Sequence, residues 1–197
     1  LNLTIETLDG LIKHNGPVKN ITSYKKMLKK ELFNKKIIFN TFPSLEAQIA
    51  SISDDIAYNN HDLEDGLRAS LFSIEDISLI PDLKDLVVKH KKNEKKFRKE
   101  IIIYQIIREL INSMVTDVIN TTNKNLKKIN PQSINDIYKQ KFPIVDFSYK
   151  MKIMDKQIKT FLKRNMYNNK EVIINTNKGR KVLHKLFNFL IKNPKKF

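Results

Sequence analysis

Residues 44–68 read SLEAQIASISDDIAYNNHDLEDGLR and contain no proline. On a helix with 100° per residue, the aliphatic side chains of this stretch fall within one narrow stripe: Leu45, Ile49, Ile52, Ile56, Leu63 and Leu67. Ser44, which follows Pro43, is a suitable N-cap residue. The pattern therefore predicts a long amphipathic helix that begins after Ser44 and runs to about Phe72.

The polar side of this predicted helix carries a second stripe. Its members are spaced at i, i+4, i+8 and i+11: Asp54, Tyr58, Asp62 and Asp65. Acids one turn apart repel each other and destabilise a helix. A divalent cation, alone or bound to a phosphate chain, would attract both carboxylates and stabilise the arrangement. Carboxylate oxygens suit Mg²⁺ or Mn²⁺. An acidic stripe is also the usual solvated face of an amphipathic helix, so geometry alone leaves both interpretations open.

The stripe lies in an acidic region of a basic chain. The 197 residues hold 37 Lys and Arg against 21 Asp and Glu, a formal net charge of +16. Residues 41–80 nevertheless contain one cation, Arg68, and these acids: Glu46, Asp54, Asp55, Asp62, Glu64, Asp65, Glu75 and Asp76. Most cations elsewhere are Lys, and an excess of Lys, Asn and Ile is what an AT-rich coding sequence gives any protein. The net charge therefore bears mainly on solubility and non-specific association.

The rest of the chain predicts further helices. Helical spacing of apolar residues occurs in residues 4–14, 92–120, 147–167 and 178–192. Ser73, Pro81 and Ser133 each start a shorter helix, and Asp136 is a further cap candidate for the last of them. Residues 18–43 favour a helix followed by a loop, and residues 171–174 an extended piece. The chain is predicted to be all-α and one domain, residues 1–197, with core helices in 1–80 and a C-terminal helical region in 81–197.

Several functional classes are excluded by composition and motifs. The chain has no Cys, which rules out disulfides and thiolate metal sites, and only 4 Gly, with no GxGxxG or GxxxxGK[ST] motif. No apolar run approaches the roughly 18 residues of a membrane-spanning helix. The N-terminus lacks the pattern of a signal peptide. The chain also begins with Leu1 rather than Met and opens directly into helix-like sequence, so we expect a piece of a longer cytoplasmic polypeptide.

The segment from Asp54 to Arg68, with PSLEAQ at 43–48, resembles the bacterial deoxyguanosine triphosphate triphosphohydrolase-like proteins of the HD-domain superfamily. Flanking segments at 3–17 (LTIETLDGLIKHNGP), 114–119 (MVTDVI), 159–162 (KTFL) and 166–167 (MY) are also similar to that family. The resemblance implies an all-helical bundle and an oligomeric enzyme. Such an enzyme cleaves a deoxynucleoside triphosphate into deoxynucleoside and triphosphate, with Mn, Mg or Fe as the divalent metal.

The resemblance also implies roles for individual residues. In the family's D-x-x-x-Y-x-x-x-D pattern, Asp54 takes the place of a metal ligand, and Tyr58 and Asp62 take the places of substrate contacts. The dipeptide His61-Asp62 is not the His-Asp pair that names the superfamily. That pair, a further His ligand and a His-rich loop expected to carry the catalytic acid or base would lie upstream of Leu1, so the catalytic residues stay unknown. The chain is therefore expected to be the C-terminal part of the enzyme, inactive unless an N-terminal half is supplied in trans.

Two alternatives remain open from the sequence. The first is a helical protein that binds nucleic acid non-specifically through its many Lys, although the scarcity of Arg speaks against sequence-specific recognition. The second is a fragment of a split gene without a function of its own. Such a fragment would expose apolar surface at Leu8, Leu11 and the Ile49/Ile56 stripe.

Overall fold

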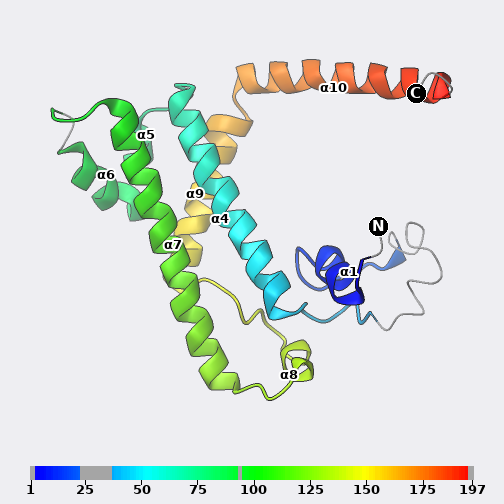
Figure 1. Ribbon diagram of the computed structural model, residues 1–197. Helices are drawn as coiled ribbons and strands as arrows, with labels where there is room; N and C mark the ends of the chain where they lie inside the picture. The colour runs from blue at the N-terminus through cyan, green and yellow to red at the C-terminus, as the bar shows by residue number, and fades with distance from the viewer. Residues whose placement is uncertain (1–2, 23–36, 93–94, 195–197) are drawn as a thin grey trace. The chain divides into compact units, whose positions relative to one another are not determined.

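The computed structural model describes residues 3–22, 37–92 and 95–194. Regular structure in these ranges is helical, without a strand, which confirms the all-α prediction. The elements, labelled as in Figure 1, are α1 (Ile5–Ile12), α4 (Leu45–Arg68), α5 (Ile74–Ser78), η1 (Pro81–Leu83), α6 (Lys84–Lys91), α7 (Lys99–Ile129), α8 (Ile134–Tyr138), α9 (Tyr149–Leu162), η2 (Lys163–Tyr167) and α10 (Lys170–Lys192). None of these helices is both long and apolar enough to cross a membrane. The helix predicted within residues 18–43 falls largely on residues 23–36, outside the described ranges.

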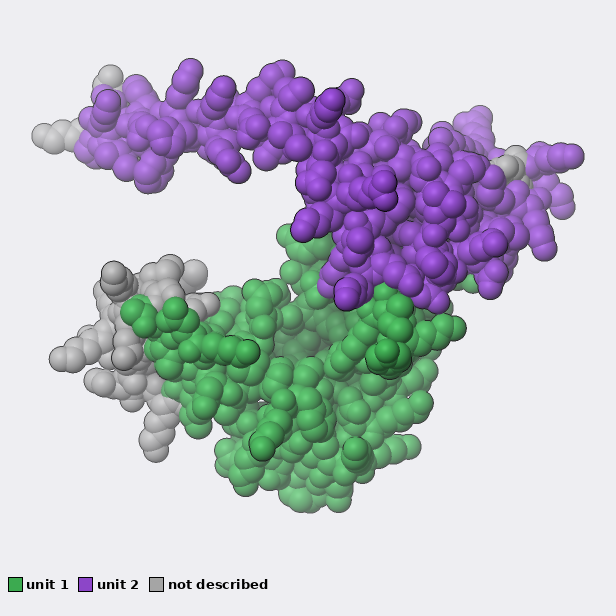
Figure 2. Space-filling model, turned by 180° about the vertical axis from the view of Figure 1, so that it is seen from behind, with its two compact units in different colours: residues 1–60, 108–153 green, residues 61–107, 154–197 purple. Residues whose placement is uncertain are grey.

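The chain divides into two compact units, which are coloured separately in Figure 2. Unit 1 comprises residues 1–60 and 108–153, and unit 2 comprises residues 61–107 and 154–197. The boundaries fall inside α4, α7 and α9, so each of these three helices contributes one part to each unit.

Side-chain caps set the starts of the helices as the sequence predicts. The Ser44 hydroxyl accepts a hydrogen bond from the Ala47 N–H at 3.4 Å, at the start of α4. At the start of α5, the Ser73 N–H donates to the Asp76 carboxylate (2.8 Å) and the Asp76 N–H donates to the Ser73 hydroxyl (3.2 Å). At the start of α8, Asp136 accepts a hydrogen bond from the Ser133 N–H at 3.0 Å.

Several predicted boundaries were wrong. The helices predicted over 92–120 and 178–192 are α7, Lys99–Ile129, and α10, which begins at Lys170. Helix α4 ends at Arg68 rather than near Phe72, because Ser70 adopts a left-handed backbone with φ of 55°. The extended piece predicted for residues 171–174 is the first turn of α10. There the Asn169 side chain accepts a hydrogen bond from the Glu171 N–H at 2.9 Å and so caps a helix that starts at Lys170.

A buried amide and a carboxylate fix the backbone of unit 1. The Gln48 side-chain oxygen accepts hydrogen bonds from the N–H groups of Ile144 (2.8 Å) and Val145 (3.1 Å). The Asp117 carboxylate on α7 accepts from both the N–H and the hydroxyl of Ser148, each at 2.7 Å. Since an unpaired buried polar group costs about 1–3 kcal/mol, these bonds hold the segment after α8 against both long helices.

In unit 2, the end of α4 packs so tightly that one position requires glycine. Leu63 and Leu67 are buried, and Phe72 meets the Phe161 ring edge-on with the ring centroids 4.9 Å apart. A Cβ atom placed on Gly66 would lie 2.2 Å from the Phe72 ring. The aliphatic stripe predicted from the sequence thus forms part of the core at this end of α4.

Candidate functional site

Asp54 carries a half-exposed carboxylate beside an imidazole. The Nε2 atom of His14 lies 3.4 Å from Oδ2 of Asp54, and the two side chains are 44% and 47% exposed. His14 belongs to the turn after α1, and its backbone oxygen accepts a hydrogen bond from the Ser51 hydroxyl at 2.6 Å. Because Ser51 precedes Asp54 on the same helix by one turn, α4 holds both the carboxylate and the turn that carries the imidazole.

A buried cation stabilises this turn. Lys13 is 2% exposed, and its amine pairs with the Asp9 carboxylate at 2.6 Å and donates to the Thr41 hydroxyl at 2.9 Å. The amine also lies 5.6 Å from the centre of the Tyr138 ring. Burial raises the pKa of the Tyr138 phenol, and the negative charge of Asp9 adds to the shift. A buried Lys needs such partners, so the residue next to His14 is firmly held.

Tyr58 follows Asp54 by one helical turn and projects into solvent. Its side chain is among the large exposed residues, at 64%. Asn59 and Asn60, the next two residues, are buried, and the Asn60 amide donates to the Ile56 backbone oxygen at 2.7 Å. Tyr58 therefore faces solvent, while the two amide side chains that follow it, Asn59 and Asn60, face the interior.

Asp62 receives a hydrogen bond from an aromatic residue distant in sequence. The Tyr167 hydroxyl, at the end of η2, donates to Oδ2 of Asp62. Burial, this hydrogen bond and the charge of Asp62 raise the pKa of Tyr167 to about 12. Both residues lie in unit 2, whereas Asp54 and Tyr58 lie in unit 1.

Two residues at the site were not assigned from sequence. Tyr167 is separated from Asp62 by 105 positions, so no local spacing links the two. The four His of the chain look scattered in the sequence, and only the fold brings His14 to Asp54. The roles predicted for Asp54, Tyr58 and Asp62 stay predictions. All three residues belong to helix α4; Asp54 and Tyr58 are exposed and Asp62 is partly exposed.

The donors at Asp54 match a part of a metal site. Among residues 3–22, 37–92 and 95–194, no group of three or more His, Cys, Asp or Glu is arranged to hold a metal ion. Asp54 and His14 offer one carboxylate and one imidazole, a donor pair that suits Mn, Fe or Zn. Because protein metal sites use four to six ligands, these residues fit as contributors to a metal centre and do not form one by themselves.

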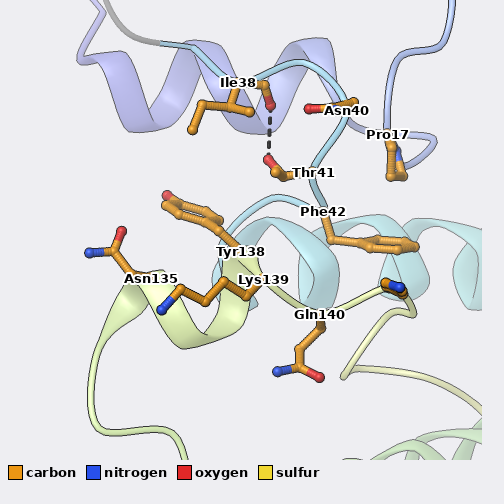
Figure 3. A pocket seen from close by; sticks show the side chains of 10 residues that line it. Pro17, Ile38, Asn40, Thr41, Phe42, Asn135, Tyr138, Lys139 and Gln140 are labelled. Carbon is orange, nitrogen blue, oxygen red and sulfur yellow. Dashed lines mark hydrogen bonds between the residues drawn. The ribbon is translucent and has the colours of Figure 1, made fainter.

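Hollows in the surface of unit 1 adjoin the His14 turn. One of about 280 Å³ is lined by His14, Ser51 and Asp55, among others, and a second of about 560 Å³ by His14, Glu46 and Tyr138, among others. The hollow in Figure 3 measures about 630 Å³ and also has Tyr138 in its lining. The Thr41 hydroxyl, which lines it too, donates to the Ile38 backbone oxygen at 2.8 Å. The two larger hollows, of about 560 and 630 Å³, have volumes within the roughly 300–1,000 Å³ that is typical of ligand pockets.

The chain is similar to known proteins along nearly its whole length. Residues 145–197 match the family described as phosphohydrolase-associated domain. A deoxyguanosinetriphosphate triphosphohydrolase-like protein from Pelagibacter ubique is 48% identical over 197 residues, which is 100% of this chain and 53% of the relative. One from Bartonella quintana is 40% identical, covering 98% of this chain and 50% of the relative.

The chain is a homologue of the deoxyguanosinetriphosphate triphosphohydrolase-like proteins. A further such protein, from Rickettsia typhi, is 35% identical over 95% of this chain and 48% of its own length. The chain therefore spans about half the length of the curated relatives it matches. This relationship to triphosphohydrolase-like proteins was predicted from the string between Asp54 and Arg68, and the match to residues 145–197 agrees with the prediction of a C-terminal part.

Proposed function

We propose that this chain is one half of a deoxynucleoside triphosphate triphosphohydrolase and supplies Asp54 as a metal ligand. The observation that carries the proposal is the half-exposed Asp54 carboxylate beside His14, on a chain that aligns along its whole length with triphosphohydrolase-like relatives. The substrate is a deoxynucleoside triphosphate, with dGTP the first candidate because of the names of those relatives. The products are the deoxynucleoside and inorganic triphosphate.

Electrostatics requires a cation in this proposal. A triphosphate is strongly negative, and each acid assigned to the site, Asp54 and Asp62, would repel it where water is excluded. A bound Mn²⁺, Mg²⁺ or Fe²⁺ polarises a phosphoryl oxygen and lowers the pKa of a bound water. The described residues supply at most Asp54 and His14, so the remaining ligands come from the half of the enzyme outside this chain.

Tyr58 and Asp62 contact the phosphates and the sugar of the nucleotide. The exposed Tyr58 hydroxyl is a donor one turn from Asp54, suited to a phosphate oxygen. Asp62 is an acceptor and suits a sugar hydroxyl, and the hydrogen bond from Tyr167 fixes its orientation. Tyr167 acts through Asp62 in this arrangement and is therefore a positioning residue.

Complementation tests the proposal. Triphosphate release from dGTP is measured with Mn²⁺ for the chain alone and for the chain mixed with the half of the Pelagibacter ubique relative that it does not match. We expect no turnover by the chain alone and measurable turnover by the mixture. Robust turnover by the chain alone would contradict the proposal that its metal site is incomplete.

A further inference from the structure

Helix α10 exposes an apolar face to solvent. The helix spans Lys170–Lys192, 23 residues or about 35 Å, and has no buried residue (Figure 1, orange to red). At 100° per residue, the large exposed apolar side chains of its second half fall within about 140° of the helix circumference. Single exposed apolar residues are normal, whereas a contiguous set on one helix marks an interaction surface. The set consists of Val182, Leu183, Leu186, Phe187 and Leu190.

The lysines of α10 gather on the opposite side of the helix, at Lys170, Lys178, Lys181, Lys185 and Lys192. The helix is therefore amphipathic, with a cationic side suited to water and an apolar side that is not. Helices in proteins gain most of their stability from the packing of such an apolar side rather than from intrinsic propensity. Because the described part of the chain buries no residue of α10, the partner that covers the apolar face lies outside it.

The relatives contain a large segment that could supply this cover. The chain matches 53% of the Pelagibacter ubique relative and 50% of the Bartonella quintana relative, so about half of each relative has no counterpart in this chain. The match to the phosphohydrolase-associated domain runs over residues 145–197, so α10 belongs to the region shared with that family. An apolar stripe on a helix has to be buried against another element of its fold.

We propose that the apolar face of α10 is a docking surface for the complementary half of the enzyme, meaning the part of the relatives that this chain does not match. The inference rests on the proposed function, in which that half supplies the remaining metal ligands. Two halves that build one metal centre have to stay together, and permanent interfaces of this kind are large and more apolar than transient ones. The face of α10 offers such a surface.

The relief of the face favours a folded protein as its occupant. Thr176 and Gly179 lie on the same side of the helix as Leu183 and Leu186, one to two turns before them. A Cβ atom placed on Gly179 would meet nothing within 4 Å. Small residues followed by leucines give a notch beside a ridge, and such relief packs against fixed side chains of a partner. A lipid surface has no fixed side chains to fill the notch.

The other occupants fit less well. A polyanion would bind the lysine side of α10 and leave the apolar face in water. A second copy of this chain would bring another Asp54 and His14, the same partial set of metal ligands. The complementary half is the occupant that the incomplete metal site already requires, and it has to bind this chain for any activity.

Co-expression of the tagged 197-residue chain with the complementary half of the Pelagibacter ubique relative tests the proposal. We expect a complex that co-purifies, with its affinity measured by biolayer interferometry. Leu186→Lys should weaken association by more than about 100-fold, because it places a charge without a partner in the interface. The matched control, Ile174→Lys, lies on the lysine side and should bind like the unmodified chain. No complex, or equal effects of the two variants, would overturn the proposal.

Triphosphate release from dGTP, measured on the same complexes, separates this proposal from the proposed function. Asp54→Asn should remove the activity and leave association unchanged. A complex that Leu186→Lys disrupts but that releases no triphosphate would contradict the proposed function and support the docking surface. An active complex whose association Leu186→Lys leaves unchanged would overturn the docking surface and leave the proposed function standing.

Thiol alkylation identifies the occupant, since the chain has no native Cys. The rate at which iodoacetamide modifies Gly179→Cys should fall at least about tenfold in the complex, while Ile174→Cys should react as fast as in the chain alone. The same rates are measured with vesicles of phosphatidylcholine and phosphatidylglycerol, and at rising concentrations of the chain by itself. If vesicles or the concentrated chain slow the reaction of Gly179→Cys and the complementary half does not, a membrane or a second copy covers the face and the proposal is wrong.

Discussion

Helices α4 and α10 have nearly the same length, 24 and 23 residues, and both have an aliphatic stripe, but they use their faces in opposite ways. In α4 the stripe is buried at Ile56, Leu63 and Leu67, and the polar face with Asp54 and Tyr58 meets solvent. In α10 the stripe itself meets solvent. An amphipathic pattern therefore predicts a helix and its two faces, and the packing of neighbouring elements decides which face remains available for function.

The largest effect is expected at the exposed acid of α4. Asp54→Asn keeps the shape of the side chain but removes the negative charge that a divalent cation needs. In the complemented mixture with the Pelagibacter ubique half, we expect triphosphate release to fall by more than about 100-fold, because even residues that only support a metal ligand cost 10–100-fold when mutated. Manganese affinity, measured by calorimetry, should fall with it.

Asp65→Asn is the matched control for this prediction, since Asp65 is an exposed acid on the same side of α4 with no assigned ligand role. It should keep most of the turnover and of the manganese affinity. Equal losses in the two variants would show that the acidic face acts through its general charge and not through a ligand at Asp54.

The two aliphatic stripes should differ sharply in stability measurements. Leu63 is 0% exposed in α4, and Leu183 is 67% exposed in α10. Leu63→Ala should lower the free energy of unfolding by about 2–5 kcal/mol, because it leaves a cavity in the core. Leu183→Ala should change it by less than about 0.5 kcal/mol in urea titrations of the monomer.

Both variants are measured in the dilute chain, so that only packing within one copy contributes to the comparison. Similar losses for both leucines in the dilute chain would show that the stripe of α10 is packed within one copy.

The fold class and the polar stripe of α4 could be predicted from sequence because both depend on local spacing and capping. Ser44, Ser73 and Asp136 act within three residues of their own positions. His14 beside Asp54 and Tyr167 against Asp62 could not be predicted this way, because tertiary packing brings them together over 40 and 105 positions. Residues 171–174 were misread because Ile and Val favour strands intrinsically, while the Asn169 cap and the following helical spacing determine the structure.

The two glycines of these helices should respond in opposite directions to alanine. Gly66→Ala in α4 forces a methyl group against the Phe72 ring, 2.2 Å from the built Cβ position, and should cost about 1–3 kcal/mol of stability. Gly179→Ala in α10 meets no atom within 4 Å and should raise the stability of the helix by about 0.5–1 kcal/mol. Thermal unfolding followed by circular dichroism measures both, and a loss of stability in Gly179→Ala would contradict the open surroundings of that position.

The smallest effect is expected at Tyr167, where the partly exposed side chain lets solvent screen the interaction. The pKa of Tyr167 is raised from 10.0 to about 12 in the folded chain, by burial first and then by the hydrogen bond and charge of Asp62. Between these two values the unfolded chain has lost a proton that the folded chain keeps, so the stabilising contribution is complete below pH 10 and is lost as the pH rises through about 12. Tyr167→Phe should make the stability fall less steeply across that window, as measured by urea unfolding at a series of pH values.

In Asp62→Asn, tyrosinate absorbance should show Tyr167 ionising at a lower pH than in the unmodified chain, since the charge that opposes the phenolate is gone. If Asp62→Asn leaves that titration unchanged, burial alone accounts for the shift, and Asp62 is not held in place by Tyr167.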